Sequence, residues 1–336
     1  MQNYLRIACA LCASLYFTAG ASHAADLDRG PTEPVQAEPR EPVKAWNWEV
    51  GARYWYSTGS TSYDLFDSTG GISISRLEYD DLTAHSGETF FRGDHASGFF
   101  VKGYVGGGII DSGKLIDEDF EPVTNPFSQT KSDQDDGSLT YASLDLGYTF
   151  YDSTARSYGL KDDPAGATGV KLGAFVGFHY LNEQLNAFGC TQLATSPICA
   201  PGDVGAGTNV ISEDADWLSL RLGLTADVYL TERLKLSAEA AYVRTSLDAA
   251  DTHHIRTDLS APLPQEGDGN GVQLEAVLSY QLTDGFNIGV GARYWHMEVE
   301  DGSLDFGPAT GGVGGRQVID FETERYGVFV QGSYKF

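Results

Sequence analysis

The chain has 336 residues and a formal net charge of −25. An acidic balance of this size disfavours nucleic acid as a partner and favours cationic peptides. Beyond its N-terminal segment, no stretch approaches the roughly 20 consecutive apolar residues of a transmembrane helix. The chain is therefore either a soluble β protein or a closed β-barrel, because only helices and closed barrels satisfy all backbone hydrogen bonds in lipid.

Residues 1–24 are typical of a secretory signal peptide. Arg6 supplies the positive charge, residues 7–17 form an apolar run, and residues 22–24 are suited to cleavage before Ala25. Cleavage removes one cation and no acid, which brings the formal charge of the mature chain to about −26. Residues 25–45 contain four prolines among charged and small residues. They predict an extended, poorly ordered periplasmic leader.

From Trp46 to Phe336 the dominant pattern is alternation with period two, clearest at residues 218–230. Even-numbered positions there are apolar, whereas odd-numbered positions such as Ser219 and Arg221 are mostly polar or small. Apolar residues facing lipid and polar residues facing the interior are typical of a transmembrane barrel. The apolar face of a soluble sandwich gives the same pattern in a single strand, so the recurrence of the pattern matters more than any one strand.

We predict an all-β fold, a ten-stranded antiparallel transmembrane β-barrel with long outer loops and short periplasmic turns. The expected strands are residues 46–56, 72–92, 98–110, 139–152, 169–182, 213–230, 234–247, 271–282, 286–298 and 320–336. Several exceed the ~9–11 residues that cross a bilayer, so the wall is expected to stand above the membrane. The alternating segment 328–336, which ends on Phe336, resembles the sorting signal of bacterial outer-membrane proteins.

Two cysteines, Cys190 and Cys199, remain after removal of the signal peptide. They lie in a stretch rich in Gly, Ser and Pro, and in an exported protein they predict a disulfide within a loop. No metal site is expected there, since no His or further Cys lies nearby.

Two short motifs carry the candidate chemistry, Asp117 with Asp119 and Asp251 with His253. Residues i and i+2 share a face of an extended strand, so each motif presents two groups to one side. Both motifs are expected at the outer end of the barrel, on strands three and seven, which lie across the mouth from each other. Asp251 would orient the imidazole of His253, the imidazole would take a proton from water, and Asp117 with Asp119 would hold that water.

Other interpretations of these motifs stay open. In an acidic chain, an Asp-x-Asp motif in a loop is more often simply solvated charge. His254, His95 and His296 compete with His253 for the role of base, although His95 is expected at the periplasmic end.

Residues 46–336 resemble the omptin family of outer-membrane proteases. The similarity rests on five segments: residues 70–79, Gly113–Phe120 with its Asp-x-Asp motif, residues 139–146, Asp251-Thr252-His253, and the C-terminal residues 332–336. The resemblance implies a ten-stranded barrel that acts as an endopeptidase through a water held by Asp and His. It implies Asp117, Asp119, Asp251 and His253 as the catalytic residues, and cleavage between basic residues.

The chain departs from the family pattern at two kinds of position. The family has a Glu near Ser62 and a further acid at the place of Ala249, and here only Asp64 and Asp248 are available as substrate-binding carboxylates. Basic residues that contact lipopolysaccharide in the family have no counterpart around residues 180–183 and 214–217. These departures weaken the implied specificity for basic residues and count against a requirement for lipopolysaccharide.

The sequence therefore predicts an endopeptidase of the bacterial outer membrane, with its active site facing the cell exterior. Its expected partners are polypeptide substrates, cationic in character, and outer-membrane lipid, without nucleic acid. No metal or organic cofactor is implied. The alternative is a non-enzymatic surface barrel of the same fold. A third hypothesis, a solute channel, is disfavoured by the narrow interior of a ten-stranded barrel.

Overall fold

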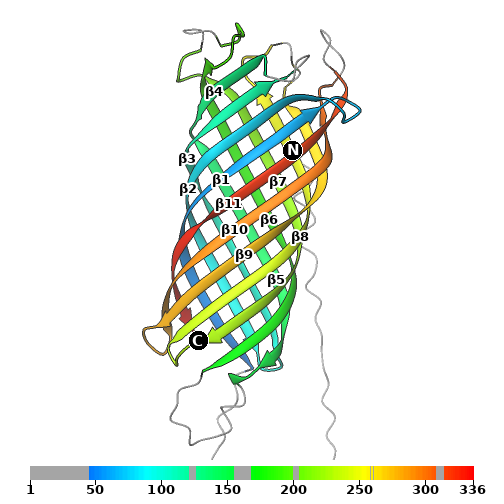
Figure 1. Ribbon diagram of the computed structural model, residues 1–336. Coiled ribbons are helices and arrows are strands. Elements are labelled where there is room, and N and C mark those ends of the chain that lie inside the picture. Colours follow the sequence, from blue (N-terminus) through cyan, green and yellow to red (C-terminus); the bar gives the residue numbers. More distant parts are fainter. Residues whose placement is uncertain are drawn as a thin grey trace, which may run out of the picture. The chain divides into compact units, whose positions relative to one another are not determined.

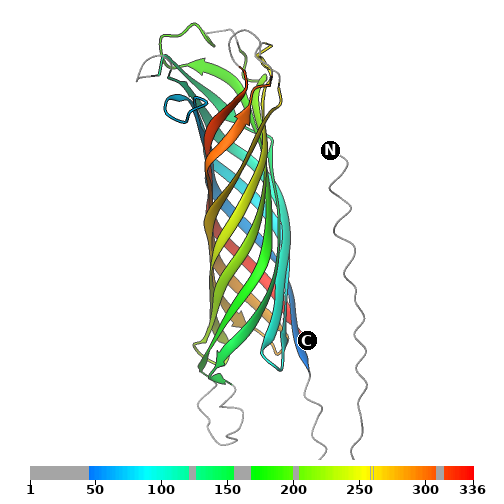
Figure 2. The same ribbon diagram turned by 90° about the vertical axis from the view of Figure 1, so that its right-hand side faces the viewer.

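The computed structural model describes residues 45–120, 126–154, 168–199, 204–257, 259, 261–307 and 314–336. They form one antiparallel sheet of eleven strands that closes into a ring (Figures 1 and 2). The strands are β1 (Trp46–Phe66), β2 (Ser73–His95), β3 (Phe99–Asp119), β4 (Ser128–Gln134), β5 (Gly137–Asp152), β6 (Gly169–Gln192), β7 (Asn209–Tyr229), β8 (Leu234–His253), β9 (Leu263–Gln281), β10 (Phe286–Asp305) and β11 (Arg316–Lys335). The prediction of an antiparallel β-barrel is confirmed. The predicted signal and nearly all of the predicted leader lie outside the described residues, as does most of the 153–168 connection.

Eleven strands occupy the ten positions predicted for the ring, because β4 and β5 share one position. β4 pairs with residues 113–119 of β3 and 187–192 of β6, and β5 pairs with the remainder of the same two strands. The end of the barrel that contains β4 is called the outer end. The two strands are separated at Asp135 and Asp136, where Asp136 has a positive φ of 53°. β4 was not predicted, since its sequence SQTKSDQ contains no apolar residue from which an alternation can be read.

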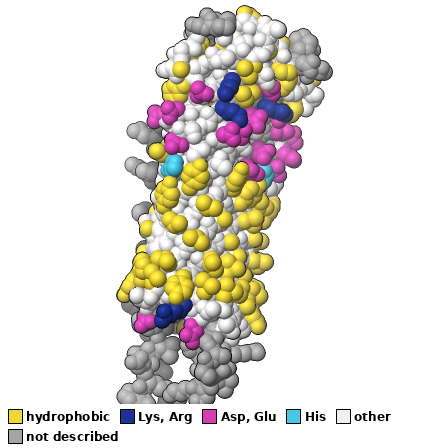
Figure 3. Space-filling model, turned by 60° about the vertical axis from the view of Figure 1, so that its left-hand side comes forward, with side chains coloured by type: hydrophobic (Ala, Val, Ile, Leu, Met, Phe, Trp, Pro, Cys, Tyr) yellow, Lys and Arg dark blue, Asp and Glu magenta, His cyan; other side chains and the backbone are white. Residues whose placement is uncertain are grey.

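A belt of apolar side chains surrounds the barrel. On β7 the exposed face is formed by Leu218, Leu220, Leu222 and Leu224, each between 48% and 64% exposed. Figure 3 shows this belt below a zone in which Asp and Glu side chains gather. Among the described residues, no helix is long and apolar enough to cross a membrane. The belt is the surface expected of a barrel that faces lipid.

The polarity of the strands inverts above the belt. On β7, Asp214 and Asp216 face outward, while Ala215 and Trp217 are fully buried in the interior. The outer third of the barrel therefore has an apolar core and an acidic outer wall. β2 has 23 residues, whereas ~9–11 suffice to cross a bilayer, so the strands extend well beyond the apolar belt.

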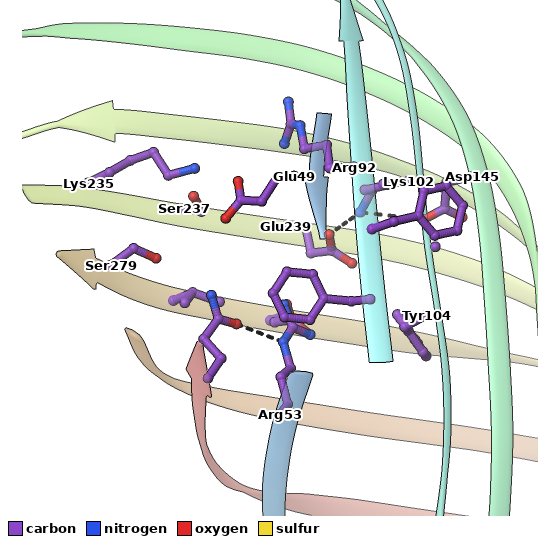
Figure 4. A pocket seen from close by; sticks show the side chains of 16 residues that line it. Glu49, Arg53, Arg92, Lys102, Tyr104, Asp145, Lys235, Ser237, Glu239 and Ser279 are labelled. Atoms are coloured by element: carbon purple, nitrogen blue, oxygen red, sulfur yellow. Dashed lines mark hydrogen bonds and ion pairs between the residues drawn. The ribbon is translucent and has the colours of Figure 1, made fainter. Parts of the chain in front are cut away.

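At the level of the belt, ion pairs fill the interior. Arg293 lies 2.7 Å from Glu88 and 2.6 Å from Glu275, and Arg53 contacts the same two carboxylates at 3.0 and 3.1 Å. A small cavity beside this cluster is lined by further alternating charges, and Figure 4 shows Lys102 between Asp145 and Glu239 there.

Aromatic rings separate this charged region from the outer end of the barrel. Trp55, Tyr141 and Trp295 are buried and pack edge to face, with ring centroids 4.9–5.7 Å apart. The interior is thus filled by side chains, as expected for a barrel of this size.

Candidate active site

A cavity opens at the outer end of the barrel, and it is lined by Asp117, Asp119, Asp251 and His253 together. Its volume is about 190 Å³. Asp117 and Asp119 come from β3, whereas Asp251 and His253 come from β8, on the far side of the ring. The two motifs, separated by more than a hundred residues, therefore line the same cavity. Their predicted positions on strands across the ring from each other agree with this arrangement.

The outer end of β3 holds its two carboxylates between flanking strands. Asp117 is paired with Leu77 of β2 and with Thr130 of β4, and Asp119 is paired with Ser75 and Ser128 in the same way. All four neighbours line the cavity. The unpredicted strand β4 thus completes the sheet around β3 and turns what was expected to be loop into a regular strand that fixes both carboxylates.

On β8, Asp251 is fully buried and accepts two hydrogen bonds on one oxygen. Its Oδ2 lies 2.9 Å from Nε2 of His253 and 2.5 Å from the hydroxyl of Tyr63 on β1. Because Nε2 donates to Asp251, the tautomer of His253 is fixed and Nδ1 remains as the basic nitrogen. Tyr63 was not identified from the sequence, since it contacts Asp251 across 188 positions of the chain.

Burial and charge shift the ionisation of these groups. Burial first, and then the negative charge of Asp119, raise the pKa of Asp117 to about 7, although His253 and Arg256 oppose the rise. Burial also raises the pKa of Asp119. Burial on its own would lower the pKa of His253, but Asp251 and Asp117 outweigh it and the net effect raises that pKa above 6.5. Near neutral pH the site therefore holds groups that can exchange a proton with water.

Further buried polar groups lie close to Asp251. They are the carboxyl group of Glu213, which interacts with the amide of Gln265, and the hydroxyl of Tyr79. Glu213 is the cross-strand partner of Asp251. Burial first, and then the charge of Asp251, hold the pKa of Glu213 well above its usual range. Glu213 lies four positions before the inward-facing Trp217, and the period of two along β7 therefore predicts that Glu213 also faces inward.

The competing histidines lie elsewhere. His254 is exposed and bonds to Ser212, with 2.8 Å between Nε2 and Oγ. His95 is the last residue of β2, at the opposite end of the strand from Ser75, and His296 lies near the outward-facing carboxylates of Glu298 and Glu322. Among the described histidines, His253 is the one that lines the cavity.

The structure places the two predicted substrate-binding carboxylates, Asp64 and Asp248, outside the cavity. Asp64 lies next to inward-facing Tyr63 on β1 and binds Arg76 on the outer wall, with 2.6 Å between Nε and Oδ1. Asp248 is exposed on β8, three positions from Asp251 and therefore on the opposite face of the strand. Neither residue lines the cavity, because the parity of each strand turns its side chain to the outer surface.

Cys190 and Cys199 form a disulfide at the edge of the cavity, with a Cα–Cα distance of 5.5 Å. Both cysteines line the cavity wall, together with Ile198. The loop after β6 is thereby tied to the outer end of the barrel.

Comparison with known proteins supports the fold. No family model and no curated protein sequence matches the chain. The outer-membrane protease OmpT of Escherichia coli is similar in structure, with a TM-score of 0.63 and 16% identity over 86% of this chain and 97% of that chain. The outer-membrane protein OprG of Pseudomonas aeruginosa also matches, with a TM-score of 0.38 and 12% identity over 87% of this chain and 96% of that chain. The first likeness shows the fold alone, that of an outer-membrane β-barrel.

Proposed function

We propose that this protein is an outer-membrane endopeptidase whose active site faces the cell exterior. The observation that carries the proposal is the single cavity in which a buried Asp251–His253 pair faces Asp117 and Asp119. The structural similarity to an outer-membrane protease supports it independently of this geometry.

In the proposed reaction, His253 is the general base. Asp251 holds its Nε2–H at 2.9 Å, and Nδ1 takes a proton from a water molecule as that water attacks the carbonyl carbon of the scissile bond. Ionised Asp117 accepts a hydrogen bond from the same water and orients it, with Asp119 beside it. Water attack gives a tetrahedral intermediate. The imidazolium then returns the proton to the amide nitrogen as the C–N bond breaks, which releases an amine and a carboxylic acid.

Peptide cleavage by the refolded barrel in detergent tests this function. Wild type is incubated with a mixed peptide library, with and without lipopolysaccharide, in parallel with His253→Ala. Loss of the base is expected to lower kcat by about 10²-fold or more. His254→Ala is the matched control, because the neighbouring imidazole is exposed and contacts Ser212 instead of the cavity. It is expected to cleave like wild type.

Two results would contradict the proposal. One is a correctly folded wild-type barrel that cleaves no peptide under either condition, which would favour a non-enzymatic surface barrel. The other is cleavage that persists unchanged in His253→Ala.

A further inference from the structure

The wall of the active-site cavity is divided chemically. Asp117, Asp119, Asp251 and His253 occupy the portion contributed by β3 and β8. Strands β1, β2, β7, β9 and β10, with the residue that follows β10, supply an apolar portion, formed by Leu65, Leu77, Ile211, Leu263, Leu304 and Phe306. The cavity thus places an apolar surface directly beside the groups proposed to activate water.

Each carboxylate of this cavity already has a role in the proposed reaction. Asp251 is hydrogen-bonded to His253 and Tyr63, and Asp117 and Asp119 hold the water. Arg256 also lines the cavity and adds positive charge close to Asp117 and Asp119. A lysine or arginine side chain entering this space would lose its hydration, which is costly, and would compete with the water for Asp117 and Asp119.

The neighbouring acids do not change this conclusion. Asp64 and Asp248 face the outer wall. Glu213 lies behind Asp251, is only 2% exposed and does not line the cavity. The acidic groups nearest to the site are therefore turned away from a bound side chain or buried behind the Asp–His pair.

The size of the cavity fits one large apolar side chain. Its volume is about 190 Å³, and an apolar cavity of ~150 Å³ is large enough to admit benzene. The ring of a phenylalanine or the branched end of a leucine therefore fits beside the catalytic groups.

We infer that the substrate places an apolar side chain, of leucine or phenylalanine size, in this cavity next to the scissile bond. The inference rests on the proposed endopeptidase function and gives its substrate class. The acidic outer wall acts at longer range and draws in peptides with cationic residues away from the cleavage point. Attraction of the peptide and recognition of one side chain are thus assigned to different surfaces.

Matched quenched-fluorescence peptides test the inference. The members share one cationic flanking sequence and differ at a single position, occupied by Leu, Phe, Lys or Arg. The expected kcat/KM for Leu and Phe exceeds that for Lys and Arg by about 10-fold or more, the effect of filling an apolar pocket. Equal or faster cleavage after Lys or Arg would overturn the inference.

Variants of the apolar wall provide a second test. Leu304 is 1% exposed and lines the cavity on β10. Leu304→Asp is expected to raise the ratio of Lys to Leu cleavage by about 10-fold, whereas the matched Leu304→Asn lowers Leu cleavage without favouring Lys. Ile74→Asp, at a partly exposed position of the wall, repeats the test if the Leu304 variants do not fold. A ratio unchanged by either acidic variant would count against the inference.

Binding separates this inference from the proposed function. His253→Ala is titrated with fluorescently labelled Leu and Lys peptides, and anisotropy reports the affinity for each. If wild type cleaves no peptide but the variant binds the Leu peptide about 10-fold more tightly, the proposed function fails and the apolar subsite stands. If the Lys peptide binds as tightly or more tightly, the subsite fails, whatever the catalytic result.

Discussion

At the scale of residues, the site depends on a few buried contacts whose partners are far apart in the sequence. Asp251 has no exposure to solvent, and both of its described hydrogen bonds fall on one oxygen. Asp117 and Asp119 share one face of β3 and disfavour each other's ionisation. The protonation of this small group should therefore control the rate.

The proposed reaction should fail at acidic pH. Asp117, with a pKa of about 7, must be ionised to orient water, and His253, with a raised pKa, must be neutral to accept a proton. Both requirements are met only above neutral pH, so kcat/KM is expected to fall as pH drops through about 7. Asp119→Asn removes a negative charge that raises the pKa of Asp117, so the acid limb of the profile should move to lower pH. A limb that stays in place or moves upward would contradict this electrostatic account.

Tyr63 is expected to be a positioning residue. Tyr63→Phe removes the hydroxyl that donates to buried Asp251. A hydrogen bond to a charged group contributes about 1.5–3 kcal/mol, so kcat is expected to fall by roughly 10-fold or more while the barrel stays folded. Tyr79→Phe is the matched control, because the Tyr79 hydroxyl is buried without a protein partner. Equal losses in the two variants would show that the effect is general packing.

At the scale of elements, a long strand such as β7 has two sections with opposite polarity. The lower section of β7 turns leucines outward, and the upper section turns Asp214 and Asp216 outward and Trp217 inward. A segment in which the apolar residues switch from one face to the other can therefore still be one continuous strand. The active-site cavity is a property of these upper sections, together with the loops tied to them.

The disulfide should stiffen one wall of the cavity. Replacing both Cys190 and Cys199 with Ser removes the closure of a short loop, which contributes about 2–3 kcal/mol in the entropic view. The loop is expected to become more sensitive to added protease, and KM to rise several-fold with little change in kcat. Steady-state kinetics and timed proteolysis measure both effects. A fall in kcat with KM unchanged would instead place the disulfide in the catalytic step.

Particular residues show how far the sequence could lead. The belt sections were predictable because apolar side chains face lipid at every second position, as in residues 218–224. The length of the upper sections was underestimated because the apolar residues change face there. They point inward up to Trp217 and outward from Leu218. The motif residues were predicted from family resemblance and spacing, whereas Tyr63 on β1 meets Asp251 on β8 only in the closed ring. Glu213 lies opposite Asp251 on the neighbouring strand β7, and its inward position follows from the alternation back from Trp217. Strand parity alone would have turned Asp248 away from Asp251.

At the scale of the whole molecule, an interior charge network and an aromatic layer fill the barrel. Arg53 and Arg293 share Glu88 and Glu275, and Trp55 and Trp295 cover them toward the outer end. Such filling is typical of small barrels and disfavours passage of solutes. In planar bilayers, the refolded protein is therefore expected to give no steady channel conductance, and a reproducible open-channel current would contradict this account.

The charge network should contribute strongly to stability. The side chain of Glu88 is fully buried between the two arginines. In Glu88→Ala, the buried charges of Arg53 and Arg293 keep only Glu275 as a partner. Removing one partner of a buried pair lowers the free energy of unfolding by about 3–5 kcal/mol. Glu322→Ala, at an exposed site on the outer wall, is the control and should change the free energy of unfolding by less than about 0.5 kcal/mol. Urea titrations in detergent measure both, and similar losses would disprove a special role for the network.

The ring is closed by pairing between β1 and β11, the first and last strands along the chain. Asp117 and His253 stand on opposite sides of that ring, so neither motif meets the other until the final strand has docked. If the proposed function is correct, an unassembled chain is catalytically latent during its passage toward the membrane. Activation then coincides with completed assembly, and the order of folding protects the compartment that the protein crosses.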